Sequence, residues 1–571
     1  MSKSNFFFGV IIFLLFLIQG IFLLPDYGMN WDEPAHYLRG QAYLRFFLTG
    51  EKDYKEFPQL KSHLPKSEFV DPPQYKWIVG DDSVFRRSIF QYDRGEGEKF
   101  TYFYYLKYDK GHPPLNGILA SLSNYIFYQR LGVFKDIESY HLFTIFLSAI
   151  LAASIFIFTS RFYGKFAGLV AVLSLSLFPL FFAESHFNIK DPVESSFYSL
   201  ALFAFYIGVV KGKWKWIIIS GVFAGFALGT KFNIIFASFS LAVWLAIYHW
   251  RSIKRVSWPF SKSQTASFVL YPFIALSILY ISWPYLWQDS KNIMHIFSYY
   301  REIGIVPYQP PGYYFFGFNT YAVWWLLFST PLVILFYCFF GIFYVLKYGL
   351  SEKNKLAIFI FLWLLVPVVR VSFSTTGIYG GLRQIMEFIP AMAILSGIGA
   401  NYLVQSLKFK IFNFKPQLLT FIFKLLIIAS FIPITIKLIS IHPNQNVYFN
   451  PFIGGLKGAY ERNFPDWGVS LGSVYQQGTD WLNQNAERGA TLALVRGLHS
   501  NIPRTKLRQD INFDNRYYSG EQRGGEYIME VIDYNWVIHV PREKRKYLEN
   551  LESVYSVKVD EVSILKIWKN D

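Results

Sequence analysis

The chain has 571 residues, of which 53% are hydrophobic and 20% aromatic, and its formal net charge is +16 at pH 7. Many apolar runs reach the roughly 18–20 residues that cross a bilayer, so the composition indicates a polytopic membrane protein and excludes an ordinary soluble enzyme. The basic residues lie in short loops between these runs, as in cytoplasmic loops, and therefore do not indicate a nucleic-acid partner. The single cysteine, Cys338, excludes an intrachain disulfide.

The first apolar run, at 6–24, follows Lys3 and lacks a small-residue cleavage site, so we interpret it as a retained span and not as a signal peptide. Ten further runs follow, at 141–160, 166–183, 193–211, 214–230, 233–250, 266–284, 320–346, 355–375, 385–405 and 420–440. Five basic loops are each separated from the next by two runs, which places all five in the cytoplasm. They contain Arg161 and Lys165; Lys211, Lys213 and Lys215; Arg251, Lys254 and Arg255; Lys347, Lys353 and Lys355; and Lys408, Lys410 and Lys415. We therefore expect eleven spans in the cell membrane, a cytoplasmic N-terminus and an external C-terminus.

The segment HPPLNGILASLSNYIFYQR, at 112–130, is the one ambiguous stretch. If it crossed the bilayer, every later basic loop would face outward. Its polar residues, among them Asn116, Ser121 and Asn124, are typical of an amphipathic helix at the membrane interface. We therefore expect it to lie at the interface, within a large first external loop at 25–140.

Residues 442–571 follow the last run, and we expect them to form a small extracytoplasmic α/β domain after a membrane module at 1–441. The stretch TDWLNQNAE predicts a helix that begins near Thr479 or Asp480. Three stretches predict strands: TLALV, NWVIHV and VSILKIW. The predicted fold is thus an all-α polytopic bundle with interfacial helices in its first external loop and a small α/β domain outside the membrane.

Paired acids stand at the first external helix start, in NWDEPAHYLRG. Pro34 suits the first helical position, which makes Glu33 the expected N-cap and puts Asp32 on the preceding turn. Two other external helix starts also place a polar residue before proline, Asp191 in NIKDPVESS and His112 in GHPPL. Either these side chains converge on one site at the outer face, or each only caps its own helix.

Cationic side chains are expected at the same face. Four candidates could bind a phosphate carried by a lipid, namely His112, Lys231, Arg301 and Arg383. The alternative is that they are interfacial anchors. A divalent metal is a further possibility, with ligands drawn from Glu33, His112, His295 and Asp191, although histidines in external loops are usually only polar surface.

The order of these motifs resembles that of the GT-C glycosyltransferases that use polyprenyl-phosphate sugars. WDEPAHYLRG is followed by HPPLNG, by FNIKDPVESSFYSLALFAFY and by GVFAGFALGTKFNIIF. The resemblance is greatest to the protein O-mannosyltransferase-like and aminoarabinose-transferase-like branches. It covers residues 1–300 best and the remainder more loosely.

The resemblance implies transfer of a sugar, with inversion, from a polyprenyl-phosphate donor to a protein, polysaccharide or glycolipid acceptor. It implies that Asp32 is the general base and that Asp191 is the second-loop acid. His112, Lys231 and Arg383 would then stabilise the departing phosphate. Relatives have lysine where this chain has His112, which puts that role in doubt. The alternative is a transporter or flippase of a lipid-linked sugar, but the sequence shows no inverted repeat.

Overall fold

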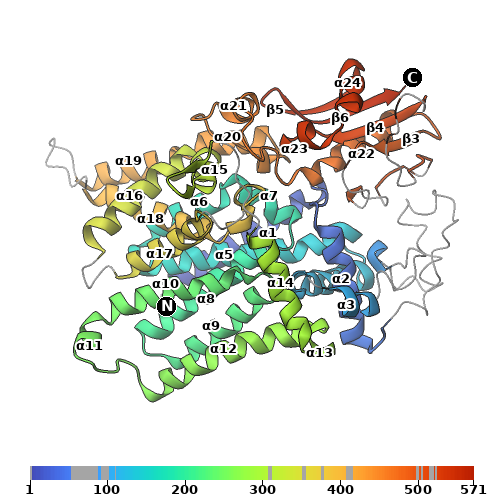
Figure 1. Cartoon of the computed structure of the whole chain (residues 1–571). Helices are drawn as coiled ribbons and strands as arrows, with labels where there is room; N and C mark the ends of the chain where they lie inside the picture. Colours follow the sequence, from blue (N-terminus) through green and yellow to red (C-terminus); the bar gives the residue numbers. More distant parts are fainter. Residues whose placement is uncertain are drawn as a thin grey trace.

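The computed structural model describes most of the chain as a bundle of helices with a sheet at one end (Figure 1). The described residues are 3–52, 88–91, 102–109, 111–305, 312–349, 355–373, 378–406, 416–496, 501–502, 506–508, 510–513, 518, 520 and 524–570. Much of the expected first external loop and the loop before 416 lie outside these ranges.

The helices of the N-terminal half are α1 (Lys3–Leu23), α2 (Glu33–Thr49), α3 (Tyr102–Tyr108), α4 (Leu115–Asn124), α5 (Asp136–Tyr163), α6 (Lys165–Ser176), α7 (Pro179–Phe187), α8 (Asp191–Val210), α9 (Trp214–Leu228), α10 (Ala237–Tyr248), α11 (Trp250–Lys254), α12 (Lys262–Ser282) and α13 (Tyr285–Gln288). Those of the C-terminal half are α14 (Lys291–Ile305), α15 (Tyr321–Ser329), α16 (Leu332–Tyr348), α17 (Lys355–Arg370), α18 (Phe388–Ser406), α19 (Pro416–Ala429), α20 (Ile432–Ser440), α21 (Gly455–Glu461), α22 (Tyr475–Asn485), α23 (Tyr534–His539) and α24 (Arg542–Asn550).

Six helical segments within the described residues are long and apolar enough to cross a membrane. They are Lys3–Asp26, α5, α8, α12, α18 and Gln417–Ser440. Two bent pairs bring the number to eight, α6 with α7 at 62° and α15 with α16 at 118°. The other expected runs are occupied by α9, by Phe232–Tyr248 and by α17. The polytopic helical architecture is thus confirmed, whereas the count of eleven spans stays a prediction.

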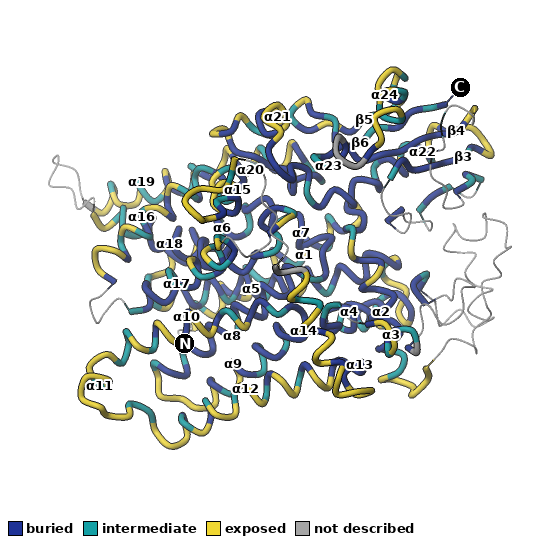
Figure 2. Tube along the Cα trace, in the orientation of Figure 1, coloured by how far each residue is buried: buried dark blue, intermediate teal, exposed yellow. Residues whose placement is uncertain are grey.

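Burial separates an inner from an outer set of helices. Figure 2 shows mostly buried residues along α5 and α8 and long exposed stretches on α12 and α19. The exposed side chains of the outer helices are apolar, for example Phe22, Phe273 and Leu426. An extended apolar surface of this kind is typical of contact with lipid.

The ambiguous segment forms α4 followed by a π-helical turn at Tyr125–Arg130. It is not among the helices that are long and apolar enough to span. Its polar side chains are buried rather than exposed at an interface, because α4 packs against α2 and α5. Asn124, for example, donates through Nδ2 to Asp136 Oδ1 at 2.8 Å. The polar pattern therefore reflects contacts within the protein.

The C-terminal region contains a four-stranded sheet in the order β3-β4-β6-β5. Its strands are β3 (Thr491–Leu494), β4 (Glu526–Val531), β5 (Ser553–Val559) and β6 (Val562–Asn570), and a separate hairpin joins β1 (Tyr314–Phe315) to β2 (Phe318–Asn319). Strand β3 pairs with β4 in parallel, and the other two pairings are antiparallel.

Two of the three predicted strands, TLALV and VSILKIW, correspond to β3 and β6. The third prediction is wrong, because NWVIHV lies in α23, where buried Trp536 stacks on Trp568 of β6 with ring centroids 6.0 Å apart. The helix predicted near Thr479 exists as α22, but it begins earlier, at Tyr475.

Candidate functional site

Asp32 stands at the start of α2, where it was expected to face the outer side of the membrane. Its side chain is 52% exposed, and Oδ2 lies 3.2 Å from Nη1 of Arg383. Helix α2 begins at Glu33 and not at Pro34, so Asp32 occupies the N-cap position. The prediction that Glu33 is the N-cap is therefore wrong. The Asp32 side chain makes no capping hydrogen bond. Its carboxylate therefore faces Arg383 instead of its own helix.

Glu33 is buried, with 2% of its surface exposed. Oε2 accepts a hydrogen bond from the Asn30 amide at 2.9 Å, and Oε1 accepts one from the Ile189 amide at 3.2 Å. Nε2 of His141 lies 3.0 Å from Oε2. The helix starts one residue earlier than predicted because the His36 amide donates to the Asp32 carbonyl, at 3.3 Å. Glu33 thus connects the Asp32 turn, α5 and the start of α8.

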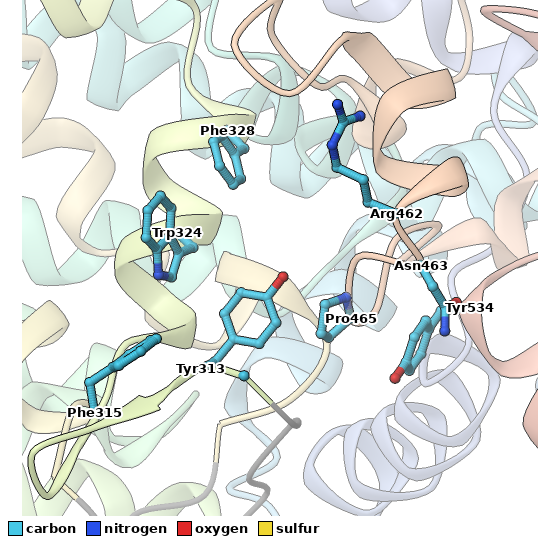
Figure 3. A pocket seen from close by; sticks show the side chains of 9 residues that line it. Tyr313, Phe315, Trp324, Phe328, Arg462, Asn463, Pro465 and Tyr534 are labelled. Atoms are coloured by element: carbon cyan, nitrogen blue, oxygen red, sulfur yellow. The ribbon is translucent and has the colours of Figure 1, made fainter.

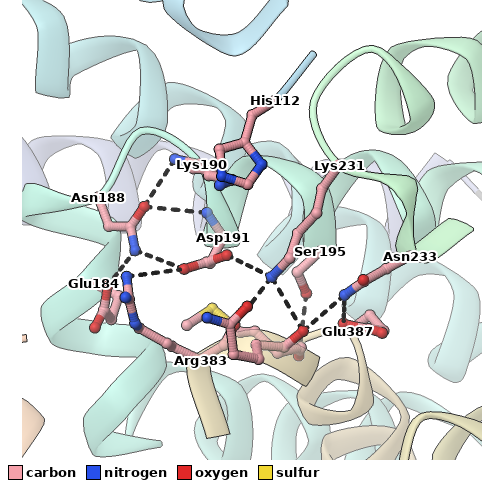
Figure 4. A network of polar contacts seen from close by, with 12 residues as sticks. His112, Glu184, Asn188, Lys190, Asp191, Ser195, Lys231, Asn233, Arg383 and Glu387 are labelled. Atoms are coloured by element: carbon pink, nitrogen blue, oxygen red, sulfur yellow. Dashed lines mark hydrogen bonds and ion pairs between the residues drawn. The ribbon is translucent and has the colours of Figure 1, made fainter. Parts of the chain in front are cut away.

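Asp191 is the first residue of α8 and is 3% exposed. Its Oδ1 accepts a hydrogen bond from Lys231 Nζ at 2.7 Å, and its Oδ2 lies 4.0 Å from Arg383 Nη1. Lys231 also donates to the Gln384 carbonyl at 3.1 Å. Figure 4 shows Asp191 between the two cations. Four of the residues expected from the sequence therefore meet: Asp32, Asp191, Lys231 and Arg383.

Lys190 is a member of this cluster that the sequence reasoning missed. It lies directly before α8, is partly buried, and interacts electrostatically with Asp191 and Asp32. Burial lowers the pKa of the Lys190 ammonium to about 8, although both carboxylates oppose that shift. The sequence signal was present, because NIKDP places a lysine next to the candidate acid.

The neighbouring cations determine the charge state of Asp32. The partial removal of this exposed carboxyl from solvent would by itself raise its pKa, but Arg383 and Lys190 oppose that effect, and the net result is a pKa below the usual range. The reciprocal effect raises the pKa of Arg383, whose guanidinium lies beside Asp32 and Asp191, despite its burial. Asp32 is therefore an ionised carboxylate at neutral pH and Arg383 is a permanent cation.

Asn188 orders the loop before α8. Its Oδ1 accepts hydrogen bonds from the amides of Lys190 and Asp191, at 2.9 and 3.1 Å. Its Nδ2 donates to Asp191 Oδ2 at 3.0 Å and also to the buried carboxylate of Glu184. An asparagine that bonds the backbone two residues on is a common turn device. It fixes both charged side chains at the start of α8.

Figure 4 shows His112 beside Lys190. The imidazole of His112 is neutral at this position. Burial, reinforced by Lys190, holds the pKa of His112 well below its ordinary value. Its Nδ1 is 3.0 Å from the Tyr300 hydroxyl, and its carbonyl accepts a hydrogen bond from Arg39 at 2.6 Å. Arg39 is buried and ion-paired with Asp109 at 2.9 Å, an arrangement that the sequence reasoning also missed.

The other candidates do not join the cluster. Arg301 and His295 lie exposed on α14. Within the described part of the chain, no three His, Cys, Asp or Glu side chains are arranged to hold a metal ion. Both Glu33 oxygens accept backbone hydrogen bonds, His112 Nδ1 contacts the Tyr300 hydroxyl, and His295 lies exposed on another helix, α14. The expected set of Glu33, His112 and His295 does not fit a metal site.

A pocket of about 540 Å³ is lined by residues outside the charged cluster, and Figure 3 shows their side chains. Its lining is Gly312, Tyr313, Phe315, Trp324, Phe328, Arg462, Asn463, Pro465 and Tyr534. Asp466, next to this wall, accepts hydrogen bonds through Oδ2 from the Gly380 amide at 2.8 Å and from the Tyr321 hydroxyl at 2.5 Å. The pocket therefore adjoins the loop that carries Arg383.

Residues 111–276 match the sequence profile of the family described as dolichyl-phosphate-mannose-protein mannosyltransferase. This segment contains His112, Lys190, Asp191 and Lys231, and the match confirms the resemblance that the motifs indicate. No curated protein matches the chain.

Several solved structures are similar to the chain at low sequence identity. ArnT from Cupriavidus metallidurans bound to undecaprenyl phosphate is 15% identical, with 98% of this chain and 97% of that chain covered and a TM-score of 0.48. The Archaeoglobus fulgidus oligosaccharyltransferase tethered with an acceptor peptide is 11% identical, with 93% and 69% covered and a TM-score of 0.48.

Proposed function

We propose that this protein is a membrane glycosyltransferase that moves a sugar from a polyprenyl-phosphate donor to an acceptor at the outer face of the membrane. The observation that carries the proposal is one accessible carboxylate, Asp32, beside two cations, Arg383 and Lys190, with a third cation, Lys231, paired to the neighbouring Asp191. Sugar transfer from a lipid phosphate needs both a base for the acceptor and positive charge for the leaving phosphate. The family match over 111–276 supports the same function.

The proposed reaction is a single displacement. The acceptor hydroxyl or amine gives its proton to Asp32 while its oxygen or nitrogen bonds to the anomeric carbon of the sugar. The bond between that carbon and the phosphate oxygen breaks, and its electron pair stays on the polyprenyl phosphate. Attack opposite the leaving group inverts the anomeric centre.

The cations act on the charge that develops as the phosphate leaves. Lys231 is oriented by Asp191 and by the Gln384 carbonyl, and Arg383 lies between Asp32 and Asp191. Donors that are fixed before the reaction stabilise such charge without reorganisation. Asp191 is then a positioning residue for the cations, and Glu33 is one for the Asp32 turn. No step of this reaction is assigned to a metal.

The experiment is transfer in proteoliposomes supplied with a panel of radiolabelled polyprenyl-phosphate sugars and with extracts that contain protein, polysaccharide and glycolipid acceptors. A transferase cleaves the donor and releases polyprenyl phosphate in amounts equal to the glycosylated product. A transporter or flippase moves the intact donor across the bilayer without cleaving it. Movement of label without cleavage would overturn the proposal.

A further inference from the structure

The loop that leads into α2 contacts the C-terminal region before it reaches Asp32. The Tyr27 hydroxyl donates to Gln445 Oε1 at 2.8 Å, and both groups are buried. One residue earlier, Asp26 Oδ2 lies 2.8 Å from Nε2 of His442. Residues separated by more than 400 positions in the sequence thus fix the start of this loop.

Asn30 carries the most concentrated set of these contacts. Its side-chain Oδ1 accepts a hydrogen bond from the Trp31 amide at 2.7 Å. Its carbonyl accepts one from Asn501 Nδ2 at 2.5 Å, and a longer one from the Glu33 amide at 3.3 Å. Asn30 is 1% exposed and Asn501 is 0% exposed. Without Asn501 this buried carbonyl would keep only the longer bond from the Glu33 amide, which favours rotation of the peptide that follows Asn30.

The same region also approaches the loop through backbone. A Cβ at Gly472 would lie 3.0 Å from the Met29 carbonyl and 3.0 Å from the Trp31 amide nitrogen. Tyr475, at the start of α22, packs edge-on against Trp31 with ring centroids 5.8 Å apart. The C-terminal region therefore forms one wall of the turn on which Asp32 stands.

We propose that Asn501 is a positioning residue for Asp32, and that the C-terminal region is part of the active site rather than an appended domain. The hydrogen bond from Asn501 sets the orientation of the peptide that follows Asn30, two residues before the base. A base must lie within hydrogen-bond reach of the proton that it removes, and a misplacement of about 1 Å can cost about 100-fold in rate. This inference rests on the proposed function of Asp32.

The test is the variant Asn501→Asp, which keeps the shape of the side chain but sets an acceptor against the Asn30 carbonyl. Asn483→Asp is a matched control in the same region, because the side-chain hydrogen bonds of Asn483 among the described residues are those with Lys506, at 2.6 Å, and Arg508, and not with the Asp32 loop. For Asn501→Asp we expect kcat to fall about 10- to 100-fold. The donor KM should change less than about twofold, because the cations are untouched, and Asn483→Asp should stay near wild type.

A second readout does not depend on activity. Amide hydrogen exchange across 27–33 should become faster in Asn501→Asp and stay unchanged in Asn483→Asp. If the wild-type protein transfers no sugar but this exchange still responds, the proposed function fails and the structural coupling stands. If Asn501→Asp does not accumulate as folded protein, Asn501→Ala is measured in its place. Wild-type kcat or unchanged exchange in the Asn501 variant would overturn the inference, as would equal losses in both variants.

Discussion

Replacing Asp32 with asparagine is the most direct test of the charged cluster. The change removes a carboxylate that is 52% exposed and whose ion pair with Arg383 is therefore worth only about 0–1 kcal/mol to folding. Arg383 keeps a second carboxylate, because Asp191 Oδ2 lies 4.0 Å from the same Nη1. The substitution also leaves Lys190 and Lys231 in place. We therefore expect folded yield and donor affinity to stay close to wild type.

The chemical step should respond very differently. General-base catalysis is typically worth about 10²–10⁴-fold in rate, which corresponds to about 2.7–5.4 kcal/mol of transition-state stabilisation. We expect a loss of that size in kcat for Asp32→Asn. The assay is single-turnover transfer from radiolabelled donor in proteoliposomes, with donor binding measured in parallel. Near wild-type transfer by Asp32→Asn, together with an inactive but folded Glu33→Gln, would refute the assignment and exchange the two roles.

The remaining predictions follow from the surroundings of other residues. Glu33→Gln should lose less rate than Asp32→Asn. It should lower the free energy of unfolding more, by about 1–3 kcal/mol, because the amide NH₂ of glutamine must face one of the two buried backbone N–H groups that now bond Glu33. Thermal unfolding of the two variants measures this difference. Because Lys190, with its pKa of about 8, loses its charge as the pH rises through that value, kcat/KM should fall above about pH 8, and Lys190→Arg should move that limb upward. With Cys338 changed to Ser, single cysteines at the exposed positions Val133 and Lys135 should react with an impermeant thiol reagent from outside only; labelling from the cytoplasm alone would contradict the expected topology.

The sequence predicted the helical framework well because apolar runs report directly on helices that are solvated by lipid or packed in a bundle. Charge and proline also marked the start of α8, whose first residue is Asp191, whereas the same signal misplaced the start of α2 by one residue. Lys231 and Arg383 were found because they are cations on the side of the membrane opposite to the expected cytoplasmic basic loops. That these residues meet at one site was visible only in the fold, since Asp32 and Arg383 are 351 residues apart in the sequence.

The elements and residues that sequence reasoning did not find have a common physical cause. Each contains a buried polar group whose partner is distant in the sequence and cannot be identified from it. Strand β4, EYIMEV, is fully buried although it contains two glutamates, because Glu530 pairs with Arg496 at 3.0 Å. Because of its acidic residues, EYIMEV was not predicted to be a strand, whereas the more apolar NWVIHV was predicted to be a strand and is a helix. Asn501 is equally unreadable from sequence, since a lone asparagine gives no sign that its amide reaches a carbonyl 471 residues away.

The adjacency of Asp32 and Glu33 can be explained by the geometry of a helix start. Successive residues at the beginning of a helix point about 100° apart, so neighbouring carboxylates can enter different surroundings. Glu33 turns inward and accepts hydrogen bonds from two elements, whereas Asp32 remains accessible beside Arg383. The buried acid fixes the turn, and the fixed turn lets the exposed acid hold its place without capping the helix. In the proposed reaction Glu33 therefore positions the turn and Asp32 accepts the proton, because Glu33 is 2% exposed while the Asp32 side chain is 52% exposed and within reach of an acceptor.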